Sequence, residues 1–137
     1  MLRTLSIRDF VIVDSLELDF HSGFSVLTGE TGAGKSILID ALALTLGERG
    51  DAAVVRAGCE RADISAEFDI QHLPELAYWL RATELDGDPG LVLLRRVIDK
   101  NGRSRAFVNG RPATQSQLRE AGEWLVDIHG QHAHQSL

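Results

Sequence analysis

The sequence predicts an α/β fold in which a phosphate-binding loop joins a buried strand to a helix, with an antiparallel β subdomain nearby. The glycine-rich stretch LTGETGAGKS, residues 27–36, follows a short apolar segment and precedes the strongly apolar SILIDALALTLG. Apolar and polar residues alternate across residues 2–20, and strand-like segments flank a turn signal within 91–110. Such alternation is the period of half-buried strands. A chain of 137 residues suits one domain or part of one.

The expected elements follow in chain order. A hairpin or bent pair of strands is expected over residues 2–20, and FSVLTG, residues 24–29, is a short buried strand that runs into the glycine loop. The next helix is apolar on nearly every side, so it should be buried, and Gly47 should end it. ADISAEFDI, residues 62–70, predicts a strand, and Pro74 suits the first turn of a second helix.

Turn residues organise the last third of the chain. The turn at residues 100–103 predicts a hairpin between two apolar segments, and the Asn-Gly pair at 109–110 predicts another turn. Thr114 and Gln117 fit a capping box that opens a short helix. WLVDI, residues 124–128, is then expected as a last strand-like piece, followed by a loop.

Composition excludes several classes of protein. Apolar residues form 44% of the chain, yet no apolar run approaches the roughly 18 residues of a membrane span. The N-terminus lacks the features of a signal peptide. Cys59 is the only cysteine, so no internal disulfide can form, which fits the cytoplasm. The net charge of -6 argues against a general polyanion binder, although a local basic patch remains compatible with it.

The glycine loop matches the phosphate-binding pattern G-x-x-x-x-G-K-[ST] through Gly29, Gly34, Lys35 and Ser36. Glycines let the backbone wrap so that successive N–H groups point at phosphate oxygens, and the following helix adds its positive N-terminal end. Lys35 would place its charge on the β- and γ-phosphates, and the Ser36 hydroxyl can bind Mg²⁺. The predicted nucleotide-binding residues are Gly29, Glu30, Thr31, Gly32, Ala33, Gly34, Lys35 and Ser36.

Hydrolysis needs further groups, above all an acid at the end of an apolar strand that holds Mg²⁺. Asp127 follows three apolar residues, and Asp99 ends another apolar run beside a turn; both are weak candidates. If Asp127 served, the chain could be a self-contained small P-loop NTPase or phosphotransferase. A module that only binds anions through the loop is a third reading.

Longer motifs resemble one family from end to end of the chain. They are the stretch LSIRDFVIVDSLELDFHSGFSVLTGETGAGKSILIDALALTLGERGD and the segments VRAGCERADISAEFDI, RAFVNGRPAT and DIHGQHAHQSL. Together they resemble the N-terminal part of the RecN family of bacterial DNA-repair ATPases, which are SMC-like proteins of the ABC type. The resemblance implies a P-loop ABC-type ATPase head, of which residues 1–137 form the N-terminal half.

The resemblance also implies what such a half head lacks. The LSGGE-type signature and an apolar strand ending in Asp-Glu do not occur here, and in this family they follow a long coiled coil, in the C-terminal half of the head. Two heads of a homodimer would sandwich two ATP molecules with Mg²⁺, and DNA would be a partner in double-strand-break repair and recombination, at the nucleoid. Alone, the chain should bind ATP poorly and not hydrolyse it, and its exposed edge strands should make it associate.

Functional roles are also predicted for two further sets of residues, one from the family resemblance and one from its charge. Gln131, in a loop after LVDIHG, would reach Mg²⁺ and the attacking water, with Gln135 as the alternative, and Arg56 would couple DNA to hydrolysis. Six of the 14 basic residues crowd positions 95–111, where Asp99 is the only acid. That cluster is either a solvated hairpin or a contact to DNA phosphates. Its members are Arg95, Arg96, Lys100, Arg103, Arg105 and Arg111.

Overall fold

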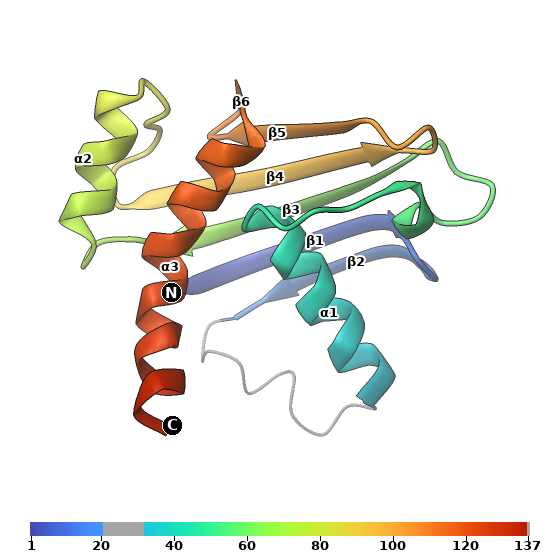
Figure 1. Cartoon of the computed structure of the whole chain (residues 1–137), viewed down its shortest axis with the longest axis horizontal. Coiled ribbons are helices and arrows are strands. Elements are labelled where there is room, and N and C mark those ends of the chain that lie inside the picture. The colour runs from blue at the N-terminus through green and yellow to red at the C-terminus, as the bar shows by residue number, and fades with distance from the viewer. Residues whose placement is uncertain (21–31, 137) are drawn as a thin grey trace.

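The core of the fold is one antiparallel sheet of six strands in the order β2-β1-β3-β4-β5-β6 (Figure 1). This computed structural model describes the backbone of residues 1–20 and 32–136 and the side chains of residues 1–20 and 36–125. The strands are β1 (Leu2–Phe10), β2 (Val13–Asp19), β3 (Arg61–Asp69), β4 (Leu91–Asp99), β5 (Ser104–Val108) and β6 (Arg111–Ala113). The helices are α1 (Gly32–Thr45), the short 3₁₀ helix η2 (Ala52–Val54), α2 (Pro74–Ala82) and α3 (Gln115–Ser136).

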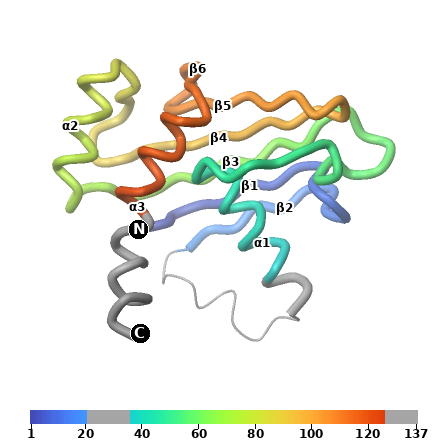
Figure 2. Tube along the Cα trace, in the orientation of Figure 1, coloured from blue at the N-terminus to red at the C-terminus, as the bar shows by residue number. Residues whose placement is uncertain are grey.

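Helices cover one face of this sheet. Figure 1 shows α1 and α3 against the same face, where α1 contacts β1, β3 and β4 and α3 contacts β5. The α2 helix lies at one end of the sheet, and the β4–β5 turn lies at the other end (Figure 2). Within the described part of the chain, no helix covers the opposite face, which we call the open face.

Alternating side chains explain why the sheet has two different faces. In β3, the residues at even positions from Ala62 to Phe68 are buried, whereas Asp63, Ser65 and Glu67 are partly exposed. Successive side chains of a strand point to opposite faces, so the apolar set packs under the helices and the polar set lines the open face.

The predicted hairpins are confirmed, but their arrangement differs from the expectation. Residues 2–20 and 91–110 were expected to form the antiparallel subdomain, whereas β3 lies between them and pairs with both β1 and β4. Ile64 of β3 is opposite Ile7 on one side and opposite Arg96 on the other. Pairing between strands distant in sequence leaves no local signal, and for this reason alternation alone did not predict β3 at the centre.

The two predicted glycine turns are confirmed by their backbone angles. Gly102 has φ +87° in the β4–β5 turn. Asn109 and Gly110 have φ +52° and +81° between β5 and β6, the left-handed pair that a two-residue turn needs. The Asn109 side chain also accepts a hydrogen bond from Leu93 N–H and donates one to the Leu85 carbonyl, so this turn is tied to its neighbours.

Helix α1 is buried on one side only, which corrects the expectation of a helix buried all round. Leu38, Ala41 and Leu44 pack into the core, whereas Ile39 is 54% exposed. The helix ends as expected at Gly47, whose φ is +98°. A paired cap closes it, because Gly47 N–H donates to Leu44 and Glu48 N–H donates to Ala43, the pattern of a Schellman motif.

The predicted capping box opens α3. The Thr114 hydroxyl accepts a hydrogen bond from Gln117 N–H at 3.0 Å, and the Gln117 side chain accepts one from Thr114 N–H at 3.0 Å. Two backbone donors that a helix start leaves without partners are thereby satisfied.

The predicted strand at residues 124–128 is wrong, because α3 continues through this segment to Ser136. A continuous apolar run fits a buried strand or a helix equally well. The helical signal lies just before it: Leu118, Ala121 and Leu125 are buried at i, i+3 and i+7, one stripe of a helix. None of the helices in the described segments is long and apolar enough to cross a membrane.

Candidate functional site

The predicted nucleotide loop lies at the start of α1. Gly29, Glu30 and Thr31, together with the predicted strand at 24–29, fall outside the described residues. The helix begins at Gly32, inside the glycine loop, and no acidic residue occurs in its first turn. A helix N-terminus without a carboxylate attracts anions through its free N–H groups and the helix dipole. This end of α1 therefore fits phosphate groups.

The two residues predicted to bind phosphate and metal, Lys35 and Ser36, belong to the first part of this helix. The backbone of Lys35 belongs to α1, and its side chain lies outside the described residues. The side chain of Ser36 is exposed, so its hydroxyl oxygen is accessible as a ligand. An oxygen donor of this kind suits Mg²⁺.

Arg96 holds the other end of α1 to the sheet. Its side chain is 1% exposed, its Nη1 donates to the Leu44 carbonyl at 2.8 Å and to the Glu48 carbonyl at 2.7 Å, and its Nε donates to Ser104 Oγ at 2.7 Å. Burial, and then the nearby charge of Arg119, lower the pKa of this guanidinium, although arginine stays protonated in proteins. The prediction of a DNA contact at Arg96 is wrong, because a phosphate cannot reach a group buried under α1.

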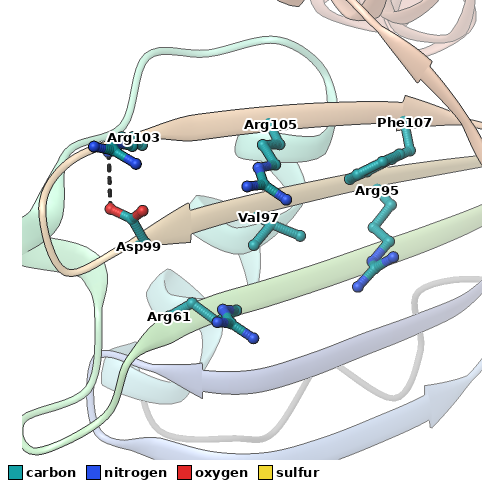
Figure 3. A pocket seen from close by; sticks show the side chains of 7 residues that line it. All are labelled: Arg61, Arg95, Val97, Asp99, Arg103, Arg105 and Phe107. Carbon is teal, nitrogen blue, oxygen red and sulfur yellow. Dashed lines mark hydrogen bonds between the residues drawn. The ribbon is translucent and has the colours of Figure 1, made fainter.

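Three other arginines of the hairpin region, Arg95, Arg103 and Arg105, lie on the open face. We define the basic face as Arg61 of β3, Arg95 of β4, Arg103 of the turn, and Arg105 of β5, with Phe107 beside them (Figure 3). Figure 3 shows these side chains on one side of the sheet, and together with Val97 and Asp99 they line a shallow hollow. Strand pairing explains the grouping, since Arg105 is opposite Val97 and Arg95 is opposite Phe107.

Two acidic residues organise the basic face. Arg95 donates two hydrogen bonds to Asp63, at 2.9 and 2.6 Å, and its guanidinium lies 5.2 Å from the centre of the Phe107 ring. The hydrogen bond to Asp63 raises the pKa of Arg95. Asp99 accepts backbone N–H groups of Arg103 at 3.0 Å and Asn101 at 2.8 Å, and the bond from Arg103 is the main cause of its lowered pKa.

Two further predicted contacts, Arg111 and Arg56, are not among the residues that line this hollow. Arg111 begins β6 at the end of β5 remote from the β4–β5 turn, and its Nη1 donates to the Glu84 carbonyl at 2.6 Å. Arg56 follows η2, and its backbone N–H donates to the Asp9 carbonyl at 2.9 Å beside the β1–β2 turn. The six predicted arginines therefore do not form one surface.

The predicted glutamine loop is a helix in this structure. Gln131 and Gln135 belong to α3, as does Asp127, which was expected at the end of a strand. Both expectations about backbone type are wrong. The strand at Asp127 was inferred from a short apolar run that also fits a helix, and the loop at Gln131 was expected from the family resemblance. The side chains of these three residues lie outside the described part, so their predicted roles stay predictions. Among the described residues, no group of histidine, cysteine and acidic side chains could hold a metal ion.

Sequence reasoning missed Arg61, Asp63 and Phe107. The signal was available, because alternation in residues 61–69 and 104–108 assigns all three to the polar face of their strands. Which strands are neighbours could not be deduced from alternation, and it is the β3–β4–β5 order that brings these residues together.

An AAA domain family model matches residues 4–119, most of the chain, and the chain belongs to this family. Its fold is that of SMC ATPase heads. A structure of an SMC ATPase, concerned with ATP-driven dimerization and DNA-stimulated activation, superposes with a TM-score of 0.67 at 23% identity, covering 89% of this chain and 79% of that one. An SMC head bound to the C-terminal winged-helix domain of ScpA gives a TM-score of 0.68 at 20% identity, covering 90% of this chain and 40% of that one.

Closer relatives in sequence are bacterial DNA repair proteins named RecN. The protein of Xylella fastidiosa strain Temecula1 is 53% identical over 137 residues, and that of Vibrio cholerae is 49% identical over 138. Each match covers 100% of this chain and 24% of the relative, so the chain spans about a quarter of the length of these proteins. The predicted resemblance to the N-terminal part of RecN is confirmed.

Proposed function

We propose that this chain is the ATP-binding N-terminal half of an ATPase head in a DNA-repair protein. The observation that supports this most is the stretch LTGETGAGKS, continued by α1, whose first turn has no acidic residue. The similarity of the whole chain to DNA repair proteins named RecN supports the biological role.

The residues of Gly29–Ser36 divide the work of holding ATP and Mg²⁺. Backbone N–H groups of the glycine loop and the N-terminus of α1 bind phosphate oxygens. Lys35 neutralises charge on the β- and γ-phosphates, and Ser36 gives an oxygen to Mg²⁺. The metal ion stabilises the negative charge that phosphoryl transfer develops. Gln131 is the proposed second contact to Mg²⁺ and to the attacking water.

Hydrolysis would need groups that residues 1–137 lack. We propose that the C-terminal half of the same head supplies the Asp-Glu pair and that a second head of a homodimer supplies the signature. Nucleotide would then add contacts only in the joined state, so it would shift the population toward that state. In this scheme ATP joins two heads and hydrolysis releases them, during recombination and double-strand-break repair in the cytoplasm at the nucleoid.

The self-contained small NTPase is the weaker alternative. It depends on Asp127 at the end of an apolar strand, whereas the backbone of Asp127 belongs to α3. Asp99, the other candidate, ends β4, and its carboxylate accepts backbone N–H groups of Asn101 and Arg103 in the β4–β5 turn.

ATPase assays distinguish the two proposals. The full-length protein should hydrolyse ATP, and Lys35→Ala should abolish turnover, because the phosphate charge loses its partner. The isolated chain 1–137 should show no turnover until the C-terminal half is added in trans. Steady hydrolysis by 1–137 alone that Lys35→Ala removes would contradict the shared site and favour the alternative.

A further inference from the structure

We infer that the basic face binds the phosphate backbone of a nucleic acid without reading its sequence. This inference rests on the proposed function, because a DNA-repair role makes DNA the expected polyanion. It differs from the sequence prediction, because it excludes Arg96, Arg111 and Arg56 and adds Arg61, which the strand order brings to the same surface.

Three guanidinium groups on this face are available to a ligand. Arg61, Arg103 and Arg105 are exposed, and among the described residues none of their side chains makes a hydrogen bond or ion pair. Asp99, which lines the same hollow, hydrogen-bonds backbone N–H groups of its own turn rather than a guanidinium, and the charges of Arg103 and Arg105 contribute to its lowered pKa. Guanidinium groups in this condition retain all their donors for phosphate oxygens.

The spacing of these groups favours a polymer over a small anion. Arg61 and Arg105 stand on β3 and β5, two strands apart, which is about 10 Å at the usual strand spacing. The hollow between the arginines has a volume of about 270 Å³, close to the lower end of the roughly 300–1,000 Å³ of small-ligand pockets, so the spacing of the arginines carries the argument. A chain of phosphates can reach several arginines in succession, whereas one phosphate cannot.

The aromatic ring on this face argues for backbone contacts rather than base contacts. The Arg95 guanidinium covers Phe107 at 5.2 Å, so this ring is not free to stack on a base. Contacts to phosphates alone give register on the nucleic acid but no sequence preference. The bound backbone should also follow the β4–β5 end of the open face, because Glu17 and Glu67 stand on the same face further along the sheet, where they would repel it.

The test is the salt dependence of DNA binding by the full-length protein. A fluorescently labelled duplex of mixed sequence is titrated at NaCl concentrations from about 50 to 300 mM, with and without ATP. Each lost phosphate contact reduces the slope of log K against log salt by about 0.9. Arg103→Ala/Arg105→Ala should therefore make the slope shallower by about 1.8 and weaken binding about 60-fold near 0.1 M salt.

A matched variant removes the same charge elsewhere. Arg3 and Arg81 are exposed and lie at the α2 end of the sheet, remote from the β4–β5 turn. Arg3→Ala/Arg81→Ala changes the net charge equally and should leave the slope within about 0.3 of wild type. Equal slopes for the two double variants would overturn the inference. That result is also the one expected if the face binds an acidic protein rather than DNA.

A third variant acts in the opposite direction, so misfolding cannot imitate its effect. Asp63→Asn releases Arg95 from its ion pair, and the slope should steepen by up to about 0.9 as Arg95 gains a phosphate. An unchanged or shallower slope in Asp63→Asn would contradict a DNA contact that includes Arg95 of β4. The two proposals can fail separately. If the wild-type protein and its variants show these slopes but the wild-type protein does not bind ATP, the proposed nucleotide site is refuted and the inference about the basic face stands.

Discussion

Arg95 and Arg96 are neighbours in β4 with opposite surroundings, and the same substitution at each should have different results. Arg96→Met removes a guanidinium that is 1% exposed and bonded to two carbonyls at the end of α1. Arg95→Met removes one whose side chain is 43% exposed and paired with Asp63. Methionine keeps an unbranched apolar chain of similar length, so packing changes little at either site.

The magnitude at Arg96 follows from the carbonyl oxygens that lose a donor. Leaving a buried acceptor without a partner costs about 1–3 kcal/mol. The Leu44 carbonyl retains a bond from Gly47 N–H at 3.2 Å, so its loss is partial, whereas the Glu48 carbonyl loses the contact to Arg96 entirely. We expect Arg96→Met to destabilise the attachment of α1 by about 2–4 kcal/mol. Arg95→Met should cost at most about 1 kcal/mol, the usual limit for an exposed ion pair.

Hydrogen exchange in the full-length protein measures this difference locally. Backbone amides of α1 and β4 should exchange about 30- to 700-fold faster in Arg96→Met, since 1.4 kcal/mol corresponds to a factor of ten. In Arg95→Met the same amides should change by less than about fivefold. Similar acceleration in both variants would refute the assignment of Arg96 as the link between α1 and the sheet.

Three further predictions concern the turns and caps. Gly47→Ala should cost about 2–4 kcal/mol, because φ is +98° and a Cβ would lie 2.7 Å from the Arg119 backbone. Gly58→Ala, at φ +84° with nothing within 4 Å, should cost about 1 kcal/mol; equal losses in thermal unfolding would contradict this. Thr114→Ala should cost about 1 kcal/mol, with faster hydrogen exchange confined to the start of α3. The lowered pKa of Asp99 stabilises the fold above about pH 4, and this is lost as the pH falls through the folded pKa, so Asp99→Asn should flatten the decline of melting temperature in acid.

Much of the fold could be predicted from the sequence, since local patterns determine local elements. The strand alternation in residues 2–20, the turns at 100–103 and 109–110, and the cap at Gly47 all act over a few residues. The end of the chain could not be predicted in this way. The run at 124–128 follows Gly122 and fits a strand as well as a helix, and only the stripe that begins at Leu118 identifies the helix.

The candidate sites differ in how far the sequence predicts them. The phosphate loop is one continuous segment, so its spacing alone identifies it. The basic face is assembled from three strands, and a count of basic residues cannot distinguish Arg95 from Arg96. Strand periodicity does distinguish them, because Leu94 and Ile98 share the parity of Arg96 and are fully buried. Applied to β4, that parity predicts Arg96 as buried and Arg95 as outward.

The adjacency of Arg95 and Arg96 also restricts how β4 can change in length. A strand repeats every two residues, so one residue inserted or deleted before Arg95 would exchange the two arginines between the faces. A deletion would bring Val97 to the carbonyls of Leu44 and Glu48, whereas an insertion would bring Arg95 there and take it away from Asp63. Changes in length among related chains should therefore fall in the turns at either end of β4, while the strand itself keeps its nine residues.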